Sequence, residues 1–292
     1  MVINCKEISS EWDEETKLLF KSHMMYKVCP PKLVVILVGE NSASKVYVRN
    51  KQKRCEKIGI ISENIILPEN TSEEELIYKI NELNNDDTVH GILVQLPLPK
   101  HLNEDKVVNA ISPNKDVDCF TNVNKGKLWT GNADIYPCTP LGIIKILDSI
   151  SYNLEGSIVT IIGRSNIVGK PMAAMLLEKN ASPIITHSKS YDIEKLTSIS
   201  DVIICAVGKP KFLKMQHLEQ ENDGGFETIN NPIIIDVGIN RDEENKICGD
   251  VDFEKLEPLA KAITTVPGGV GLMTVSALMR NLYICYKLSF LR

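Results

Sequence analysis

The sequence of 292 residues lacks paired cysteines, long apolar runs and an excess of positive charge. Its 8 cysteines include no C-x-x-C pair and its 5 histidines show no metal-ligand spacing, so we expect reduced thiols, no disulfide framework and no metal site. A net charge of -5 gives no electrostatic reason to bind nucleic acid or an anionic membrane. No apolar run approaches the roughly 20 residues that a membrane-spanning helix needs, so no membrane partner is expected.

The N-terminal residues also lack the apolar core of a secretory signal and the Arg-rich, acid-poor composition of a transit peptide. We therefore expect a cytoplasmic protein. Hydrophobic residues make up 43% of the chain and charged residues 24%, as in ordinary soluble globular proteins. The length is near the limit of a single hydrophobic core, which favours two domains.

Apolar runs and amphipathic segments alternate in the first half of the chain. Residues 32–39 form a continuous apolar run typical of a strand buried on both faces. A capping pattern at Ser10 and Asp13 predicts a helix over residues 9–27. The other elements predicted in this half are strands at 61–67 and 90–95 and helices at 42–58, 72–83 and 103–111.

The second half alternates in the same way, which predicts an α/β fold with mostly parallel sheets. A stretch rich in proline and glycine, residues 112–142, is predicted to connect the domains, and residues 223–231 are predicted to form a surface loop. The predicted strands are 158–162, 183–187, 202–207, 232–237 and 262–266, with a helix that begins near Gly169 and a final helix at 273–290.

The segment GRSNIVGKP, residues 163–171, follows a predicted strand and opens a predicted helix. It departs from the dinucleotide fingerprint G-x-G-x-x-G, because Ser165 occupies the middle glycine position and the last gap is one residue longer. Glycines such as Gly163 let the backbone approach phosphate, and a helix N-terminus supplies positive potential. A phosphate-binding loop is one interpretation, and a plain strand-to-helix turn is the other.

The residues after the next predicted strand favour NADP over NAD. An NAD site usually has an acid about 20 residues beyond the glycine loop, where the acid binds the ribose 2′-hydroxyl. Here residues 183–189 contain no acid, but they include Ser188 and Lys189, and Arg164 lies in the preceding loop. Donors and cations without an acid suit a 2′-phosphate.

Polar residues of the first half are candidates for catalysis. Tyr47 and Lys51 are four residues apart on a predicted helix and therefore share a face. Gln95 ends a predicted strand, at the edge where open α/β sheets bind ligands, and Asp116 and Asp118 form a carboxylate pair farther on. Each also has a simpler interpretation: an exposed Tyr/Lys pair, a strand end satisfied by Gln95, and a turn capped by Asp116.

Six segments together resemble the bifunctional methylenetetrahydrofolate dehydrogenase/methenyltetrahydrofolate cyclohydrolase family. They follow the family's order over about residues 30–290 of the chain. The segments are YVRNK (47–51), GILVQLPLP (91–99), PNKDVDCF (113–120), PCTPLGI (137–143), GRSNIVGKP (163–171) and PGGVGLMTV (267–275).

The resemblance implies an enzyme of one-carbon metabolism and purine biosynthesis. Such an enzyme oxidises 5,10-methylenetetrahydrofolate with NADP to the methenyl cation and hydrolyses that cation to 10-formyltetrahydrofolate. The resemblance implies a homodimer of chains with two α/β domains and an active-site cleft between them. Residues 1–138, completed by the helix 273–292, would form the folate-binding catalytic domain, and residues 139–272 would form a Rossmann-like NADP-binding domain.

The resemblance also implies a role for each candidate residue. Lys51 would be the catalytic lysine, Tyr47 would stack on the folate and Gln95 would bind near it. Asp118 would anchor the pterin ring, because an ionised carboxylate only accepts hydrogen bonds. The remaining implied contacts are Gly268 and Gly269 for folate, Gly163, Arg164, Ser165 and Ser188 for NADP, and Ile239 and Thr274 for its nicotinamide end.

Two positions depart from the family pattern. Cys119 stands where the family commonly has glycine, and Leu272 stands where it commonly has proline. Both changes put the shape of the predicted folate pocket in question, although we expect the Cys119 thiol to be packed and inert rather than reactive. The alternatives to the bifunctional enzyme are a dehydrogenase with only one of the two activities, a dehydrogenase for another small substrate, and a non-catalytic dinucleotide-binding regulator.

Overall fold

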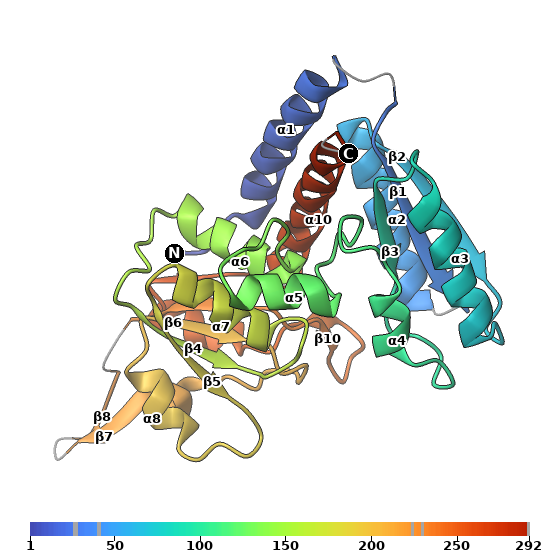
Figure 1. Ribbon diagram of the computed structural model, residues 1–292. Helices are drawn as coiled ribbons and strands as arrows, with labels where there is room; N and C mark the ends of the chain where they lie inside the picture. Colours follow the sequence, from blue (N-terminus) through green and yellow to red (C-terminus); the bar gives the residue numbers. More distant parts are fainter. Residues whose placement is uncertain (26–28, 40–41, 223–224, 229–230, 291–292) are drawn as a thin grey trace. The chain divides into compact units, whose positions relative to one another are not determined.

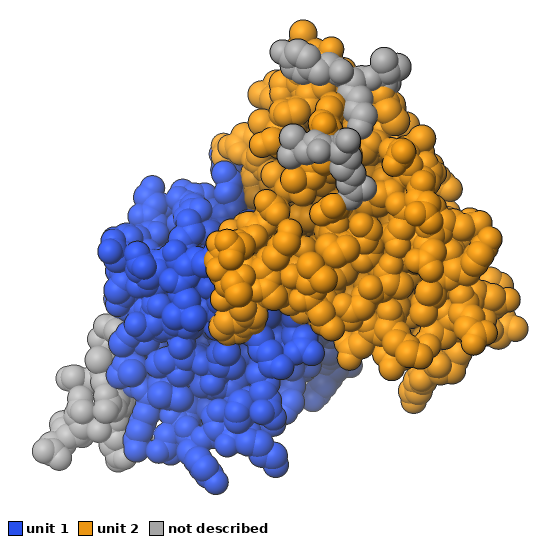
Figure 2. All heavy atoms as spheres, in the orientation of Figure 1, with its two compact units in different colours: residues 1–9, 139–274 blue, residues 10–138, 275–292 orange. Residues whose placement is uncertain are grey.

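The computed structural model describes residues 1–25, 29–39, 42–222, 225–228 and 231–290, without the side chains of residues 42–47, 219–222 and 225–228. The chain divides into two compact units, which Figure 2 distinguishes by colour. Unit 1 consists of residues Met1–Ser9 and Thr139–Thr274, and unit 2 consists of residues Ser10–Cys138 and Val275–Arg292.

The N-terminal residues Met1–Ser9 belong to unit 1. Val2 forms a parallel bridge with Ile263, and the Ile3 amide donates a 2.9 Å hydrogen bond to the carbonyl of the same residue. The first residues thus extend the edge of the unit 1 sheet. This pairing could not be predicted from a segment too short to show a strand pattern.

Helix α1 (Cys5–Met24) begins earlier than the capping pattern at Ser10 and Asp13 predicted. The side chain of Asn4 accepts the Glu7 amide at 3.3 Å and donates to the Glu7 carboxylate at 2.9 Å. The acceptance of the Glu7 amide by the Asn4 side chain is an N-cap hydrogen bond, so the helix starts after Asn4. Ser10 and Asp13 lie in the helix interior.

Unit 2 is built on a three-stranded parallel sheet in the order β2-β1-β3 (Figure 1). Its strands are β1 (Lys32–Val38), β2 (Ile61–Leu67) and β3 (Gly91–Val94), which confirms the three predicted strands to within one residue. Every β1 residue from Leu33 onward is buried, as expected of a central strand covered on both faces.

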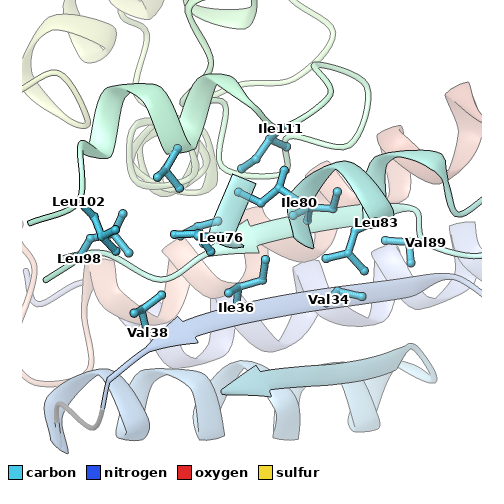
Figure 3. Close-up of a cluster of buried hydrophobic side chains, with 13 residues drawn as sticks. Val34, Ile36, Val38, Leu76, Ile80, Leu83, Val89, Leu98, Leu102 and Ile111 are labelled. Atoms are coloured by element: carbon cyan, nitrogen blue, oxygen red, sulfur yellow. The ribbon is translucent and has the colours of Figure 1, made fainter. Parts of the chain in front are cut away.

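An apolar cluster covers one face of this sheet (Figure 3). It joins alternate residues of β1 to the apolar stripe of helix α3 (Glu73–Asn85) and to residues around helix α4 (Glu104–Asn109), since strand side chains alternate between faces. Its buried members include Val34, Ile36, Val38, Leu76, Ile80, Leu83, Leu102, Val107 and Ile111.

Helices α2 (Ser42–Ile58) and α10 (Val270–Leu288) both contribute to the core of unit 2. The Cys55 thiol lies 3.6 Å from the Met279 sulfur, and a Cβ on Gly91 would overlap the Leu282 side chain. Gly91 therefore allows α10 to approach β3 closely. The buried Asp13 carboxylate of α1 connects this helix to α10 and α2. It accepts a 2.8 Å hydrogen bond from Ser276 of α10 and forms an ion pair with Arg54 of α2.

Unit 1 contains a five-stranded parallel sheet in the order β12-β9-β6-β4-β5. The chain runs from β4 to β5 on one side and then to β6 on the other, so the connections change direction between β4 and β6, where open α/β sheets bind ligands. Helix α7 (Gly169–Glu178) begins where the sequence predicted. The strands are β4 (Ile158–Ile162), β5 (Ser182–Thr186), β6 (Val202–Cys205), β9 (Ile233–Asp236) and β12 (Ala262–Ile263).

The predicted connection 112–142 contains one helix and the start of another, α5 (Asn122–Trp129) and α6 (Cys138–Ser149). Thr121 caps α5, and Pro140 lies in the first turn of α6, where proline is tolerated because its missing N–H has no intrahelical partner. Part of the predicted loop 223–231 lies outside the described residues, and the rest includes β8 (Gly225–Thr228), which pairs with β7 (Glu219–Asn222).

None of the helices in the described ranges is long and apolar enough to cross a membrane.

The remaining elements of unit 1 are short. The short elements are α8 (Ile193–Ser198), η1 (Met215–His217), β10 (Asn240–Arg241), β11 (Ile247–Cys248), α9 (Phe253–Leu256) and η2 (Glu257–Leu259).

We predict that Asp13→Ala lowers the free energy of unfolding of unit 2 by about 3–5 kcal/mol, because it removes one partner of a buried ion pair. The side chain of Asp13 is 0% exposed and that of Arg54 is 17% exposed. Glu14→Ala, on the same helix, breaks only the exposed pair with Lys17 and should cost at most about 1 kcal/mol. Urea unfolding of the two variants measures the difference, and equal midpoints would contradict the role of Asp13.

Candidate active site

Lys51 and Gln95 meet in unit 2. Lys51 lies on α2. Gln95 directly follows β3, which ends at Val94. The Lys51 ammonium donates a 3.1 Å hydrogen bond to Gln95 Oε1, and Gln95 Nε2 donates to the Leu96 carbonyl at 2.7 Å. Both side chains are half-buried. The amide of Gln95 thus satisfies the strand end and also orients the lysine.

The backbone of Tyr47 lies in α2, one turn before Lys51, but its side chain is outside the described part of the structure. The predicted pairing of these two side chains therefore remains a prediction.

Asp118 lies within the electrostatic reach of Lys51. Burial raises the pKa of the Asp118 carboxyl above its ordinary value, while the positive charge of Lys51 and a hydrogen bond with Cys138 hold the rise back. Asp116 adds a smaller contribution that raises the pKa further. A carboxyl group and an amine are thereby brought into one partly desolvated region of unit 2.

The neighbours of Asp118 in the KDVD segment are structural. Lys115 is buried and donates to the carbonyls of Leu83, Asn84 and Asp86 at 2.8–2.9 Å, at the end of α3. Asp116 accepts hydrogen bonds from the amides of Phe120 and Thr121 and from the side chain of Asn124. The capping interpretation of Asp116 is therefore confirmed, and both residues anchor the turn that carries Asp118.

Cys119 occupies a left-handed backbone position, with a φ angle of 59°. This conformation favours glycine and explains why glycine suits the position. The thiol is buried and donates a 3.1 Å hydrogen bond to the Ile135 carbonyl. Burial raises the pKa of the thiol above its ordinary range, which disfavours the reactive thiolate and confirms the prediction of a packed, inert cysteine.

The glycines of the predicted phosphate loop in unit 1 permit close packing of backbone. Gly163 has a φ angle of 132°, and a Cβ there would overlap the carbonyl oxygen of Ala206. A Cβ on Gly169 would overlap the Gly163 carbonyl. The loop after β4 therefore packs directly against the loop after β6, at the point where the strand order reverses.

Ser165 accepts hydrogen bonds from the backbone at the start of helix α7. Its hydroxyl oxygen accepts the Val168 amide at 3.1 Å and the Gly169 amide at 3.4 Å, and its carbonyl accepts the Lys170 amide at 3.1 Å. The sequence led us to expect free helix amides as phosphate ligands, but these three are occupied by Ser165. The hydroxyl proton of Ser165 and the exposed side chains around it can still donate to a phosphate.

Arg164 and Ser188 follow neighbouring strands at the same edge of the sheet. Ile162 pairs with Thr186, so each of the two residues lies two positions beyond that pair. A turn in which the His187 amide donates to Ser190 at 3.0 Å leaves Ser188 exposed. Within the described ranges, neither side chain makes a hydrogen bond or ion pair. These donors, with the exposed Lys189, fit a nucleotide 2′-phosphate.

Ile239 and the first turn of α10 come together in unit 1. Ile239 Cδ1 lies 3.6 Å from the position of a Cβ on Gly271, and Thr274 shares a 3.1 Å hydrogen bond with Thr139. Leu272 lies in the same turn, and its amide donates to the Gly269 carbonyl at 3.0 Å. Proline has no backbone N–H, so it would remove this hydrogen bond, although the position lies in the first turn of the helix.

Gly268 and Gly269 also belong to unit 1, just before α10. Gly268 has a φ angle of 98°, and a Cβ on Gly269 would overlap the Thr265 carbonyl. The simpler interpretation, a tight turn, accounts for both glycines. Their predicted contact with folate remains a prediction.

Asp236 and Asp250 form a buried carboxylate pair that the sequence analysis missed. Asp236 ends β9 and Asp250 follows β11, and burial raises the pKa of the Asp236 carboxyl to about 7 against the effect of three backbone donors. The available signal was the position of Asp236 at the carboxyl end of a buried strand, where parallel sheets gather functional groups.

Two regions of the chain match models of one enzyme family: residues 3–118 match its catalytic domain and residues 137–290 its NAD(P)-binding domain. A bifunctional protein FolD of Streptococcus thermophilus is 50% identical over 253 residues, which are 87% of this chain and 86% of the relative. The crystal structure of the bifunctional FolD enzyme from Campylobacter jejuni matches with a TM-score of 0.92 and 42% identity over 99% of both chains.

The crystal structure of the Trypanosoma brucei N5,N10-methylenetetrahydrofolate dehydrogenase-cyclohydrolase, complexed with NADP and an inhibitor, matches with a TM-score of 0.87. Its identity is 32%, and the match covers 99% of this chain and 98% of that one. These matches confirm the resemblance that the six sequence segments carried. The chain belongs to the tetrahydrofolate dehydrogenase/cyclohydrolase family.

Proposed function

We propose that this protein oxidises 5,10-methylenetetrahydrofolate with NADP and hydrolyses the methenyl product to 10-formyltetrahydrofolate. The observation that carries the proposal is the hydrogen bond between Lys51 and Gln95, in the segment that matches the family's catalytic domain. The match of residues 137–290 to the NAD(P)-binding domain supports the cofactor, as does the NADP bound to the Trypanosoma brucei relative.

Lys51 is the proton carrier of the hydrolysis. Addition of water to the methenyl carbon releases a proton, and opening of the ring delivers a proton to the departing nitrogen. One amine can serve both steps when a neighbour holds it at the reacting carbon, and Gln95 provides that neighbour through its amide oxygen. Tyr47, one helical turn away, stacks on the folate.

Asp118 anchors the pterin ring. Its carboxylate accepts hydrogen bonds from the ring's amino and N–H groups, and Lys115 and Asp116 hold the turn on which it lies. The backbone of Gly268 and Gly269 lines the folate pocket in this proposal.

When bound, NADP would supply the acceptor for the hydride of the methylene carbon. Hydride transfer needs no acid or base, so the chain's contribution is to bind and orient. Arg164, Ser165 and Ser188 hold the phosphates, with the backbone near Gly163, while Ile239 and Thr274 line the nicotinamide end. Arg164, Lys189 and the Ser188 hydroxyl can bind the 2′-phosphate of NADP. Residues 183–189 contain no acid that would bind the 2′-hydroxyl of NAD, so the site selects NADP.

The proposal extends to the organisation of the protein. Unit 2 is the folate-binding catalytic domain and unit 1 the NADP-binding domain, and the enzyme is a cytoplasmic homodimer that serves purine biosynthesis. These statements rest on the family resemblance, and size-exclusion chromatography with light scattering tests the dimer.

The purified protein should be mixed with 5,10-methylenetetrahydrofolate and either NADP or NAD, and the ultraviolet spectrum followed with time. We expect reduced cofactor with NADP, and methenyl absorbance that passes on to the 10-formyl product. Methenyl that accumulates would indicate a dehydrogenase without cyclohydrolase activity. Nucleotide binding without any folate turnover would refute the proposal in favour of a regulator.

Lys51→Met should abolish the cyclohydrolase activity, because the loss of acid–base catalysis costs about 10²–10⁴-fold. Hydrolysis of added methenyltetrahydrofolate measures the effect directly, without NADP. Lys53→Met changes an exposed lysine of the same helix and should leave the rate unaltered. Hydrolysis by the Lys51 variant at near the wild-type rate would show that another group carries the proton.

Arg164→Ala should raise the Kd for NADP about 10- to 150-fold, the effect of one lost charge-assisted hydrogen bond, and change the Kd for NAD little. Titration calorimetry with each nucleotide measures both constants. Lys179→Ala, at the opposite end of α7, is the matched control for removal of a cation. A parallel loss of affinity for NADP and NAD would show that Arg164 does not read the 2′-phosphate.

The affinity for folate should fall as the pH is lowered, with a midpoint above the ordinary aspartate pKa of about 4. Burial raises the pKa of Asp118, so its acceptor carboxylate is lost at a higher pH than an exposed one would be. Calorimetry with 5-formyltetrahydrofolate, a stable ligand, measures the profile. Asp118→Asn should bind weakly at every pH, and a variant that keeps the wild-type profile would exclude Asp118 as the titrating group.

A further inference from the structure

Asp250 holds the loop that follows β6. Its Oδ2 atom accepts the amides of Val207 at 2.6 Å and Gly208 at 2.9 Å, and Oδ1 accepts the amide of Lys209 at 2.9 Å. Three consecutive amides therefore converge on one buried carboxylate. A carboxylate accepts such a set well because it has two oxygens and no donor.

Asp236 in turn holds Asp250. Its carboxylate accepts the amides of Asp250 at 2.9 Å and Val251 at 3.1 Å. A Cβ on Gly249 would overlap the Asp236 carboxylate, and a Cβ on Gly238 would overlap that of Asp250. The two carboxylates thus lie against bare backbone, so their positions are closely restricted.

The loop held by Asp250 is in contact with the phosphate loop. Ala206 directly precedes the three bound amides, and its carbonyl occupies the space that a Cβ on Gly163 would need. The Gly163 carbonyl fills the corresponding space at Gly169, where α7 begins. A continuous line of backbone contacts therefore runs from Asp250 to both glycines of the predicted phosphate loop.

The same pair of carboxylates also fixes the segment that carries Ile239. The Gly238 amide donates to Asp236 at 3.0 Å, and the Asn240 side chain donates to Asp250 at 2.7 Å. Ile239 lies between these two anchors and is half exposed, at 51%. One buried pair therefore restrains both the phosphate side and the nicotinamide side of the proposed cofactor site.

We propose that Asp250, supported by Asp236, is a positioning residue that sets the two loops of the NADP site. The inference rests on the proposed function and adds to it residues that need not touch the cofactor. Burial of this pair is costly, since desolvation and the nearby Asp250 charge both raise the pKa of Asp236. The amides of three separate loop segments, 207–209, 238 and 250–251, depend on the pair.

Asp250→Asn tests the inference, because the amide keeps the size but turns one acceptor oxygen into a donor that faces N–H groups. We expect the Kd for NADP, measured by calorimetry, to rise at least about tenfold, as on loss of one charge-assisted hydrogen bond. The Kd for 5-formyltetrahydrofolate and the cyclohydrolase rate, which needs no NADP, should stay within about twofold of the wild type. Asp242→Asn is the matched control, because Asp242 also accepts two backbone amides but lies in the β10–β11 turn.

An unchanged Kd for NADP in Asp250→Asn would overturn the inference. An equal loss of NADP binding, folate binding and cyclohydrolase activity would also overturn it, since that result indicates a general structural role. If Asp250→Asn does not fold, Asn240→Ala decides the question: it removes a single donor to Asp250 and should weaken NADP binding several-fold with folate binding unchanged. Failure of the proposed function appears separately, as a wild type that does not turn over 5,10-methylenetetrahydrofolate.

Discussion

Burial of both faces of a parallel sheet is the constraint on which the rest of this structure depends. β1 from Leu33 onward and the whole of β6 are apolar and buried, which leaves no room for polar side chains along these stretches. Polar chemistry is therefore confined to the ends of the strands, and parallel strands share one carboxyl edge. Lys51 and Gln95 meet at such an edge in unit 2, and Arg164 and Ser188 follow such an edge in unit 1.

Loops at these edges have backbone amides that need partners away from water, and buried side chains supply them. Asp116 accepts two amides beside α5, and Asp250 accepts three beside β6. Lys115 does the converse for three carbonyls at the end of α3. In each case a buried charged side chain holds a stretch of backbone in place by several hydrogen bonds.

Much of the fold could be predicted from sequence because apolar runs bounded by glycine and proline mark strands. The buried strand β4, the more exposed strand β2 and the helix α2 were all predicted with their observed bounds. Helix α6 was missed, because Pro140 suggests a break although it lies in a first turn, where it is harmless. The start of α1 was misjudged for a similar reason, since Asn4 caps the helix and Ser10 does not.

The candidate site was less accessible to such reasoning. Lys51 and Gln95 are 44 residues apart, so their hydrogen bond depends on tertiary packing. The position at a strand end and the family resemblance singled out the two residues, but neither predicted that they bond to each other. The amides that Asp250 accepts, in residues 207–209, lie 41 to 43 residues earlier in the chain, so no local sequence pattern predicts this contact. The inert state of Cys119 likewise depends on its burial and on the Ile135 carbonyl.

The division of the chain between the two units has a consequence for the order in which a growing polypeptide can fold. The unit boundaries fall inside α1, α6 and α10, and unit 2 takes its last part from Val275–Arg292. That segment supplies fully buried residues of unit 2, among them Leu282 and Tyr286. During synthesis, most of unit 2 is made before most of unit 1. Unit 2 nevertheless lacks its last segment until Val275–Arg292 is made, so unit 1 has all its residues first. The Gly91 side of β3 lacks its contact with Leu282 until α10 is made, so unit 2 does not follow the usual N-terminal-first order.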